Sequence, residues 1–427
     1  MTTIQQSIFT FTKTTGLHYP KLYIFYSTNL LYWFKTLHML KYTALFLLLT
    51  NCFFAVAQKG RFTFIDTHND VLSKQIENGA DLAIHQPALN FDLLKASDGN
   101  LGAQVFSIWC GEIYGKGKAF ARANREIDSL LSLIQRNPGK MAFVTNSSEL
   151  KKAMQQKKLA AMIGVEGGHM IEERMDLLDS LINRGMKYLT LTWNNSTTWA
   201  TSARDEVTRK DSLPQPGLSE MGKKIVARLN EAGVMVDVSH AGEKTFADVM
   251  AVTTRPVIAT HSCVWSLAPH RRNLKDEQLK AIAKNGGVVF VNFYSGFVDS
   301  SYEAKKQLFI SQHKAILDSL TALLGGDDDI ATIQLFTLYP AAANALRPPL
   351  SQLIKHIDYI AKLIGVDHVG IGADYDGAES FPLQLTDVSC YPVIITELKK
   401  LGYSNKDLKK ISSENFIRVL KANEKKG

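Results

Sequence analysis

The chain has few of the features that mark disulfide-stabilised, membrane-spanning or nucleic-acid-binding proteins. It contains only 4 cysteines in 427 residues, and none of them has the Cys-x-x-Cys spacing of zinc or redox sites. Beyond residue 57, no apolar run approaches the ~20 residues that cross a bilayer. The formal charge is +8, but residues 1–57 contain four lysines and no acidic residue, so half of the excess lies there. The remaining positive charge, on residues 58–427, is too small to indicate nucleic acid as a partner.

Residues 1–57 have the composition of a leader. Met39-Leu-Lys41 is a short positive start, residues 42–56 are mostly apolar, and Ala55-Val56-Ala57 before Gln58 has the pattern of a signal-peptidase site. We therefore expect a signal peptide at 39–57, preceded by an over-extended gene start, and an exported mature domain at 58–427, periplasmic or secreted. A lipid anchor on Cys52 is the alternative.

From residue 61 onward, short β-like runs alternate with longer segments of helical period. Strands are expected near 62–67, 102–109, 160–166, 187–193, 234–240, 256–261, 287–294 and 368–374. Helices are expected in segments such as 119–135, 175–184, 220–232 and 276–284, whose apolar residues recur three and four apart.

About eight β/α repeats without a dividing linker favour a single α/β domain, a (β/α)8 TIM-type barrel. Residues 295–350 are too long for one crossover, which predicts an insertion after the seventh strand. A doubly wound open sheet is the alternative, but no Gly-x-Gly-x-x-Gly follows the first strand.

Several predicted strands end in residues that bind metals. His68 and Asp70 follow the apolar run 62–65, and in a strand residues i and i+2 point the same way, about 6.5 to 7 Å apart, so both can reach one ion. Four other runs end in the same manner, at Glu166, His240, His261 and Asp374. Because the carboxyl ends of barrel strands line one mouth, these side chains should converge there.

The predicted ligands are three imidazoles and two carboxylates, a set that suits zinc or a similar divalent metal. Five ligands are too many for one catalytic zinc but suit two ions if Glu166 bridges them. Such a site acidifies water and polarises a carbonyl or phosphoryl oxygen. Asp374 is then left as a proton acceptor, with Asp376 competing for that role. His169 is expected to structure a loop near the mouth.

These motifs resemble those of the renal (membrane) dipeptidases, zinc peptidases with a (β/α)8 fold. The resemblance covers nearly all of the mature chain, and its main motifs are Asp66-Thr-His68-Asn-Asp70, Gly164-Val-Glu166-Gly-Gly-His169, Val236-Asp-Val-Ser-His240, His261-Ser, Arg271-Arg272-Asn273 and Gly370-Ile-Gly-Ala-Asp374-Tyr-Asp376-Gly377.

The resemblance implies a role for each of these residues. His68 and Asp70 would hold one zinc, His240 and His261 the other, with Glu166 between them. Arg272 would grip the terminal carboxylate of a dipeptide. Asp374 would move a proton from the attacking water to the leaving amine. The family also suggests a homodimer.

Trp193 departs from the family pattern. After Tyr188-Leu-Thr-Leu-Thr192 the family places a histidine that contacts substrate, whereas this chain has an indole, which donates one hydrogen bond and carries no proton. Metal binding should survive this change, while substrate choice and turnover should be affected. Three functions therefore stand open: an exported dizinc dipeptidase, a metal-dependent hydrolase of another small amide, lactone or phosphoester, and a non-catalytic, metal-stabilised binding protein.

Overall fold

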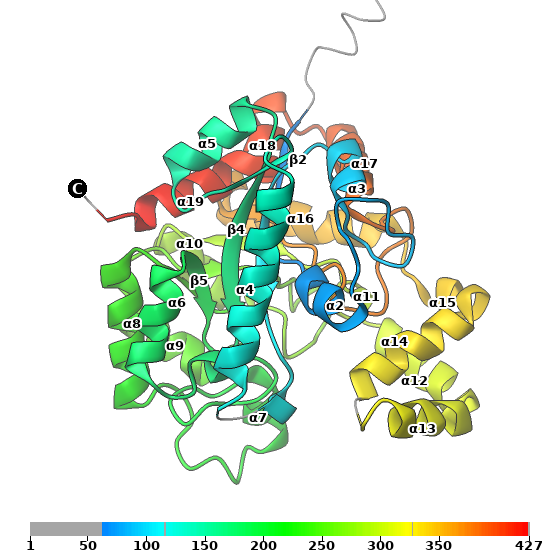
Figure 1. Cartoon of the computed structure of the whole chain (residues 1–427). Coiled ribbons are helices and arrows are strands. Elements are labelled where there is room, and N and C mark those ends of the chain that lie inside the picture. The colour runs from blue at the N-terminus through cyan, green and yellow to red at the C-terminus, as the bar shows by residue number, and fades with distance from the viewer. Residues whose placement is uncertain (1–61, 115–116, 327, 426–427) are drawn as a thin grey trace, which may run out of the picture. The chain divides into compact units, whose positions relative to one another are not determined.

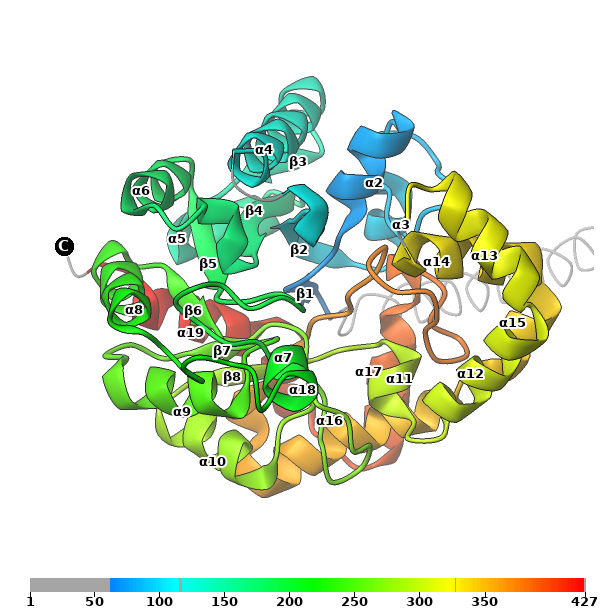
Figure 2. The ribbon, with the colours of Figure 1, turned by 90° about the horizontal axis from the view of Figure 1, so that it is seen from below.

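The computed structural model describes residues 62–114, 117–326 and 328–425, so the expected leader lies outside the described residues. Eight parallel strands within them form a ring: β1 (Phe64–Asp66), β2 (Leu101–Ile108), β4 (Leu159–Glu166), β5 (Met186–Thr190), β6 (Met235–Asp237), β7 (Ile258–Ala259), β8 (Val288–Val291) and β9 (Val369–Ile371). Since β2 also pairs with β4, and β1 pairs with both β2 and β9, the ring is closed (Figure 2). The predicted barrel is confirmed, and the open sheet is excluded.

A short extra strand, β3 (Met141–Phe143), lies outside the set predicted from sequence. It pairs in parallel with Leu159–Ala161 at the start of β4, ahead of the point where β5 joins β4 at Ile163. The sequence analysis did not predict this strand.

Helices surround the ring (Figures 1 and 2). They are α2 (Val71–Asn78), α3 (Leu93–Asp98), α4 (Ala119–Arg136), α5 (Ser147–Gln155), α6 (Met175–Asn183), α7 (Ala203–Thr208), α8 (Glu220–Ala232), α9 (Glu243–Val252), α10 (Asp276–Lys284), α16 (Leu350–Ile364), α17 (Pro392–Lys400), α18 (Asn405–Lys409) and α19 (Asn415–Asn423). Single turns of 3-10 helix lie at η1 (Glu112–Tyr114), η2 (Gly168–Ile171), η3 (Val366–His368) and η4 (Val388–Cys390), and η5 (Lys410–Glu414) is a π-helical turn.

Helix α8 shows how the local sequence sets these elements. The Ser219 side chain accepts a hydrogen bond from the backbone N–H of Gly222 and caps the first turn. Gly233 ends the helix with φ at 72°, a conformation that glycine adopts without a Cβ clash. Ile225 and Leu229, four residues apart, are both buried, so one face of the helix packs on the barrel.

The barrel interior is filled by alternate residues of the strands. On β4, Ala160 and Met162 belong to a cluster that also contains Ile65 from β1 and Phe290 from β8. Residues from strands so far apart in the ring can share a cluster only inside it. The intervening β4 residues, such as Ile163, pack with the helices instead. The interior is therefore a packed core, and chemistry is left to the loops at its mouth.

The predicted insertion after the seventh strand of the ring is present and helical. It contains α11 (Ser295–Val298), α12 (Tyr302–Gln312), α13 (Lys314–Leu323), α14 (Asp328–Leu338) and α15 (Pro340–Leu346), drawn from yellow-green to yellow in Figure 2. These helices have their own small core of Tyr302, Phe309, Leu335 and Phe336. Among the described residues, no helix is both long and apolar enough to cross a bilayer.

Candidate metal centre

The carboxyl ends of the strands bring the predicted ligands together. Glu166 is the last residue of β4, while His68, His240, His261 and Asp374 lie two or three residues beyond the ends of β1, β6, β7 and β9. His240 and Asp374 have positive φ angles of 64° and 63°. Non-glycine residues tolerate that conformation only where the surroundings enforce it, and such positions cluster at functional sites.

Asp66 explains why His68 and Asp374 lie side by side. Its buried carboxylate accepts hydrogen bonds from the backbone N–H of His68 at 3.2 Å and of Ala373 at 2.9 Å. The N–H of Asp374 in turn donates to the carbonyl of His68 at 3.1 Å. One carboxylate below the mouth therefore ties the end of β1 to the end of β9.

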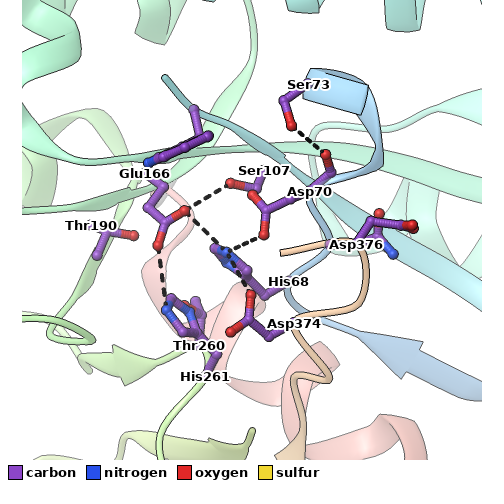
Figure 3. Close-up of polar contacts among 12 residues, drawn as sticks. His68, Asp70, Ser73, Ser107, Glu166, Thr190, Thr260, His261, Asp374 and Asp376 are labelled. Carbon is purple, nitrogen blue, oxygen red and sulfur yellow. Dashed lines mark hydrogen bonds and ion pairs between the residues drawn. The ribbon is translucent and has the colours of Figure 1, made fainter. Parts of the chain in front are cut away.

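Glu166 lies at the centre of the cluster, and its two oxygens face different partners (Figure 3). Its Oε2 is 3.3 Å from His68 Nε2, whereas its Oε1 is 3.1 Å from His240 Nε2 and 3.4 Å from His261 Nε2. On the Oε2 side, His68 Nε2 also lies 3.6 Å from Asp70 Oδ2. Glu166 thus stands between two groups of potential ligands.

Two sets of ligand atoms among the described residues are close enough to hold a cation: His68, Glu166 and His261, and His68, Asp70 and Asp374. His240 belongs to neither set and joins the cluster through Glu166 and through the ring of His261, whose centroid lies 5.0 Å from its own. The structure brings all five predicted ligands and Asp374 to one point of the mouth.

Hydrogen bonds leave a ring nitrogen of two histidines free to bind a metal. The Tyr188 hydroxyl donates to the carbonyl of Thr67 at 3.1 Å, so at 2.9 Å it accepts from the Nδ1–H of His68. The Thr260 hydroxyl donates to Asp237 at 2.6 Å, so at 2.8 Å it accepts from the Nδ1–H of His261.

In the neutral form of each ring, this tautomer directs the lone pair of Nε2 into the cluster, where each Nε2 is buried and has no hydrogen-bond partner. On His68 a metal ion would take the place of the proton that Nε2 otherwise holds. Asp70 Oδ1 is buried without a partner as well. A divalent cation is the group that such atoms fit.

The charge distribution also favours a cation. Burial alone would lower the pKa of His68, but Glu166, Asp70 and Asp374 outweigh it and raise the pKa to about 10. Burial raises the pKa of Asp70 well above its usual value, although His68 opposes this. Carboxylates gathered around His68 therefore attract positive charge to this point.

His240 and His261 behave differently from His68. Burial, followed by the positive charge of Arg272, lowers the pKa of His240 to about 3. Burial likewise lowers the pKa of His261 well below its usual value. Both rings are neutral at neutral pH, which is the form that binds metals.

Arg272 is buried beside the cluster, with its guanidinium over the ring of Phe297 at 5.3 Å. One amino group donates to the carbonyl of His261 at 3.3 Å, whereas Nε is buried and has no hydrogen-bond partner. Burial lowers the pKa of Arg272 to about 10, so the guanidinium stays charged. A buried cation with an unused N–H is suited to an anionic group of a ligand.

The indole of Trp193 faces the mouth. Its ring centroid lies 6.5 Å from that of His240 and 5.0 Å from that of Trp109. The sequence analysis did not single out Trp109. It directly follows β2, and its place at a strand end was the signal that could have found it.

Asp376 and His169 take structural positions. Asp376 Oδ1 accepts from the N–H of Asn90 at 2.8 Å, and Asp376 points away from the ligand cluster (Figure 3). His169 Nε2 donates to the carbonyl of Cys110 at 2.8 Å and joins the loops after β2 and β4. Asp374, in contrast, has Oδ1 4.0 Å from His68 Nε2.

The sequence reasoning assigned no role to several polar residues that support the cluster. Asn292 donates to Asp374 Oδ2 at 2.9 Å, and Ser107 donates to Glu166 Oε2 at 3.3 Å. Tyr188 and Thr260 orient the histidines as described above. Asn292 directly follows β8, and this position at a strand end is a signal that the sequence offers. Ser107 lies within β2, and its neighbours in sequence give no sign of a role at the site.

Comparisons with known proteins agree with this geometry. Residues 55–427 match the family model described as membrane dipeptidase, peptidase family M19. Among solved structures, the dipeptidase AC, a metallopeptidase of family M19, is 22% identical with a TM-score of 0.70 over 85% of this chain and 98% of that one. The probable dipeptidase PvdM from Pseudomonas aeruginosa is 24% identical with a TM-score of 0.69, over 85% of this chain and 96% of its own.

A metallopeptidase from Rhodobacter sphaeroides, solved with a phosphinate mimic of the dipeptide L-Ala-D-Ala, is 22% identical with a TM-score of 0.69, over 85% of this chain and 99% of that one. At these identities the solved structures establish a common fold, while the family model spans nearly all of the described barrel. With ligand-type residues gathered at the barrel mouth, the chain belongs to the membrane dipeptidase family, peptidase family M19, and is a metal-dependent hydrolase.

Proposed function

We propose that this protein is an exported dipeptidase that hydrolyses the peptide bond of dipeptides with two divalent metal ions, zinc being the natural candidate. The observation that carries the proposal is the position of Glu166, whose Oε2 faces His68 while its Oε1 faces His240 and His261. The five predicted ligands are more than one catalytic zinc binds.

Each proposed metal position has its own ligands. His68 and Asp70 would hold one ion, His240 and His261 the other, and Glu166 would contribute one oxygen to each. When bound, such a pair of ions lowers the pKa of a water molecule and polarises the carbonyl that is attacked.

Two further residues would act directly on the substrate. Arg272 would bind the terminal carboxylate and so set the position of the peptide bond over the cluster. Asp374 would accept a proton from the attacking water and donate it to the leaving amine. Burial raises the pKa of Asp374 above its usual value, although His68 opposes this, and a raised pKa suits a group that must both take and return a proton. Asn292 would hold Asp374 through its hydrogen bond to Oδ2.

Metal analysis and a dipeptide screen on the purified protein test the proposal together. We expect about two metal ions per chain, release of free amino acids, and loss of both activity and bound metal in Glu166→Gln. The matched control for bound metal is Glu126→Gln, which alters a glutamate that is also fully buried but lies on α4 and binds Arg122, and which should retain about two ions per chain. Full activity in Glu166→Gln would contradict the proposal.

A second function is favoured by one observation, the indole of Trp193 beside His240. If the indole has reshaped the pocket, the same metals could act on another small amide, a lactone or a phosphoester. A panel of such substrates separates the two functions. If dipeptidase activity rises in Trp193→His, the indole is what limits the hydrolysis of dipeptides. A further loss of activity would count against a reshaped pocket.

Export and assembly are also part of the proposal. We infer that residues 39–57 direct export, that the mature domain begins at Gln58, and that it forms a homodimer. Acylation at Cys52 would instead give a lipid anchor. Mass spectrometry of the N-terminus of protein recovered from the cell envelope, followed by size-exclusion chromatography, distinguishes these outcomes.

A further inference from the structure

Two indoles form a continuous aromatic surface at one side of the barrel mouth. Trp109 follows β2 and Trp193 follows β5, the two strands that flank β4 and its terminal residue Glu166. Their rings pack edge to face, with centroids 5.0 Å apart and planes at 60°. Each indole is partly exposed, and Trp193 also lies 6.5 Å from the ring of His240. The pair therefore presents an apolar surface next to the metal centre.

The surrounding structure fixes the backbone of Trp109 and packs against Trp193. The backbone N–H of Trp109 donates to Glu126 Oε2 at 2.8 Å, and the other oxygen of Glu126 accepts from Arg122 at 2.8 Å. Gly167 has φ at 95°, and a Cβ at this position would lie 3.3 Å from the Cβ of Trp193. The loop after β4 thus runs directly against Trp193. A surface supported on both sides is suited to a binding role, because little order has to be gained when a ligand packs on it.

Arg272 lies on the far side of the ligand cluster. It is in the loop after β7 and packs on Phe297, which follows β8. Trp193, His240 and Arg272 follow β5, β6 and β7, which are consecutive in the ring. In this order His240 lies between the indole pair and the guanidinium.

This arrangement sets the direction of a bound dipeptide. If the terminal carboxylate binds Arg272 and the peptide carbonyl lies over the ligand cluster, the N-terminal residue must extend toward the indoles. Successive Cα atoms are about 3.8 Å apart, so one residue is enough to cross from the cluster to that side.

We propose that Trp109 and Trp193 form the subsite for the side chain of the N-terminal residue of the substrate, and that this subsite selects large apolar or aromatic side chains. The inference rests on the dipeptidase function proposed above and adds the substrate class. Apolar side chains gain by leaving water, and an aromatic ring gains further from edge-to-face packing on an indole. A charged side chain would lose water on this surface, and the indole N–H of Trp109, which has no hydrogen-bond partner, offers only a single donor in return.

A series of dipeptides measures the preference. We expect kcat/KM for Leu-Gly and Phe-Gly to exceed that for Gly-Gly by about 10- to 200-fold. This ratio should fall toward one in Trp193→Ala and in Trp109→Ala. The ratio of Gly-Phe to Gly-Gly should be the same in these variants as in the wild type, because the C-terminal side chain lies on the Arg272 side.

The matched control is Trp265→Ala, which removes an indole that is 39% exposed and packs on Lys275. This variant should keep the wild-type ratio. Melting temperature and bound metal, measured for each variant, verify that the fold and the metal centre are intact. A wild-type ratio near one, or a ratio unchanged by loss of either mouth indole in folded, metal-loaded protein, would overturn the inference.

A binding measurement separates this inference from the proposed function. Phosphinate analogues of Gly-Gly, Leu-Gly and Phe-Gly can be titrated without any turnover. If no dipeptide is hydrolysed, the proposed function fails, yet tighter binding of the Leu and Phe analogues that is lost in Trp193→Ala would still support the subsite. Equal affinity for all three analogues would refute the subsite whether or not dipeptides are cleaved.

Discussion

Thr260 offers a sharp test of the proposed metal centre, because it orients His261, a proposed ligand, without being one itself. Its hydroxyl accepts from His261 Nδ1 at 2.8 Å and donates to Asp237 Oδ2 at 2.6 Å. Thr260→Val keeps the shape of the side chain but removes the hydroxyl. Asp237 would still accept from the Thr190 hydroxyl and from the N–H groups of Ser239 and Thr260. The buried Nδ1 of His261, in contrast, would lose the acceptor that sets its tautomer.

The expected cost follows from that loss. Partners that orient metal-binding histidines typically contribute about 10- to 100-fold in metal affinity. Leaving a buried donor without a partner costs about 1–3 kcal/mol of stability. We therefore expect Thr260→Val to bind metal about 10- to 100-fold more weakly and to recover activity when more free metal is supplied. Competition with a chelator of known affinity measures the first effect, and activity against free metal concentration measures the second.

Thr190→Val is the matched control. Thr190 also donates to Asp237 Oδ2, at 2.5 Å, but no hydrogen bond joins it to His261 among the described contacts. It should lower stability while leaving metal affinity near the wild-type value. Wild-type metal affinity in Thr260→Val, or an equal loss in both variants, would refute the reasoning.

Three further predictions concern charged groups. Asp374→Asn should lower kcat by about 10²- to 10⁴-fold at full metal occupancy. Asp376→Asn should keep most of the wild-type kcat, because Asp376 points away from the cluster. Equal losses of kcat in the two variants would contradict the assignment of Asp374 as the group that carries the proton. Arg272→Lys should lower kcat/KM for dipeptides by about 30-fold or more, because an ammonium cannot bind a carboxylate with two parallel hydrogen bonds. An unchanged kcat/KM would show that Arg272 does not bind the terminal carboxylate of the substrate. Burial raises the pKa of Glu126 from 4.5 to about 7, although Arg122 opposes it, so the folded protein holds a proton that the unfolded chain releases. The free energy of unfolding, relative to that of Glu126→Gln, should therefore fall as pH rises from about 4.5 to 7. Denaturant titration at several pH values measures this, and a rise over that range would contradict the prediction.

The barrel could be predicted from the sequence because its signals are local. Each barrel strand lies within or beside a short apolar run, and helices such as α8 and α10 have the bounds that their three- and four-residue spacing indicates. The residues proposed as ligands could be singled out for the same reason, since His68, Glu166 and His261 stand at the ends of such runs. In a closed parallel barrel, this single local property places all of them at one mouth.

Other features of the site have no local signal. The contact of Trp109 with Trp193 joins residues from β2 and β5, and the hydrogen bond from Tyr188 to His68 spans 120 residues. The sequence also does not distinguish Asp376 from Asp374 as the candidate acid/base group. Only the folded chain shows that Asp376 binds Asn90 and turns from the cluster.

The amino-acid sequence by itself therefore determined the fold class, the family resemblance and the identity of the residues that gather at the mouth, because periodicity and strand ends are properties of neighbouring residues. The tertiary structure decided which oxygen of Glu166 faces which histidine, which histidine nitrogen carries the proton, and where the two indoles lie relative to Arg272. Those properties depend on distances between segments far apart in the chain, and these distances are set only when the ring of strands closes.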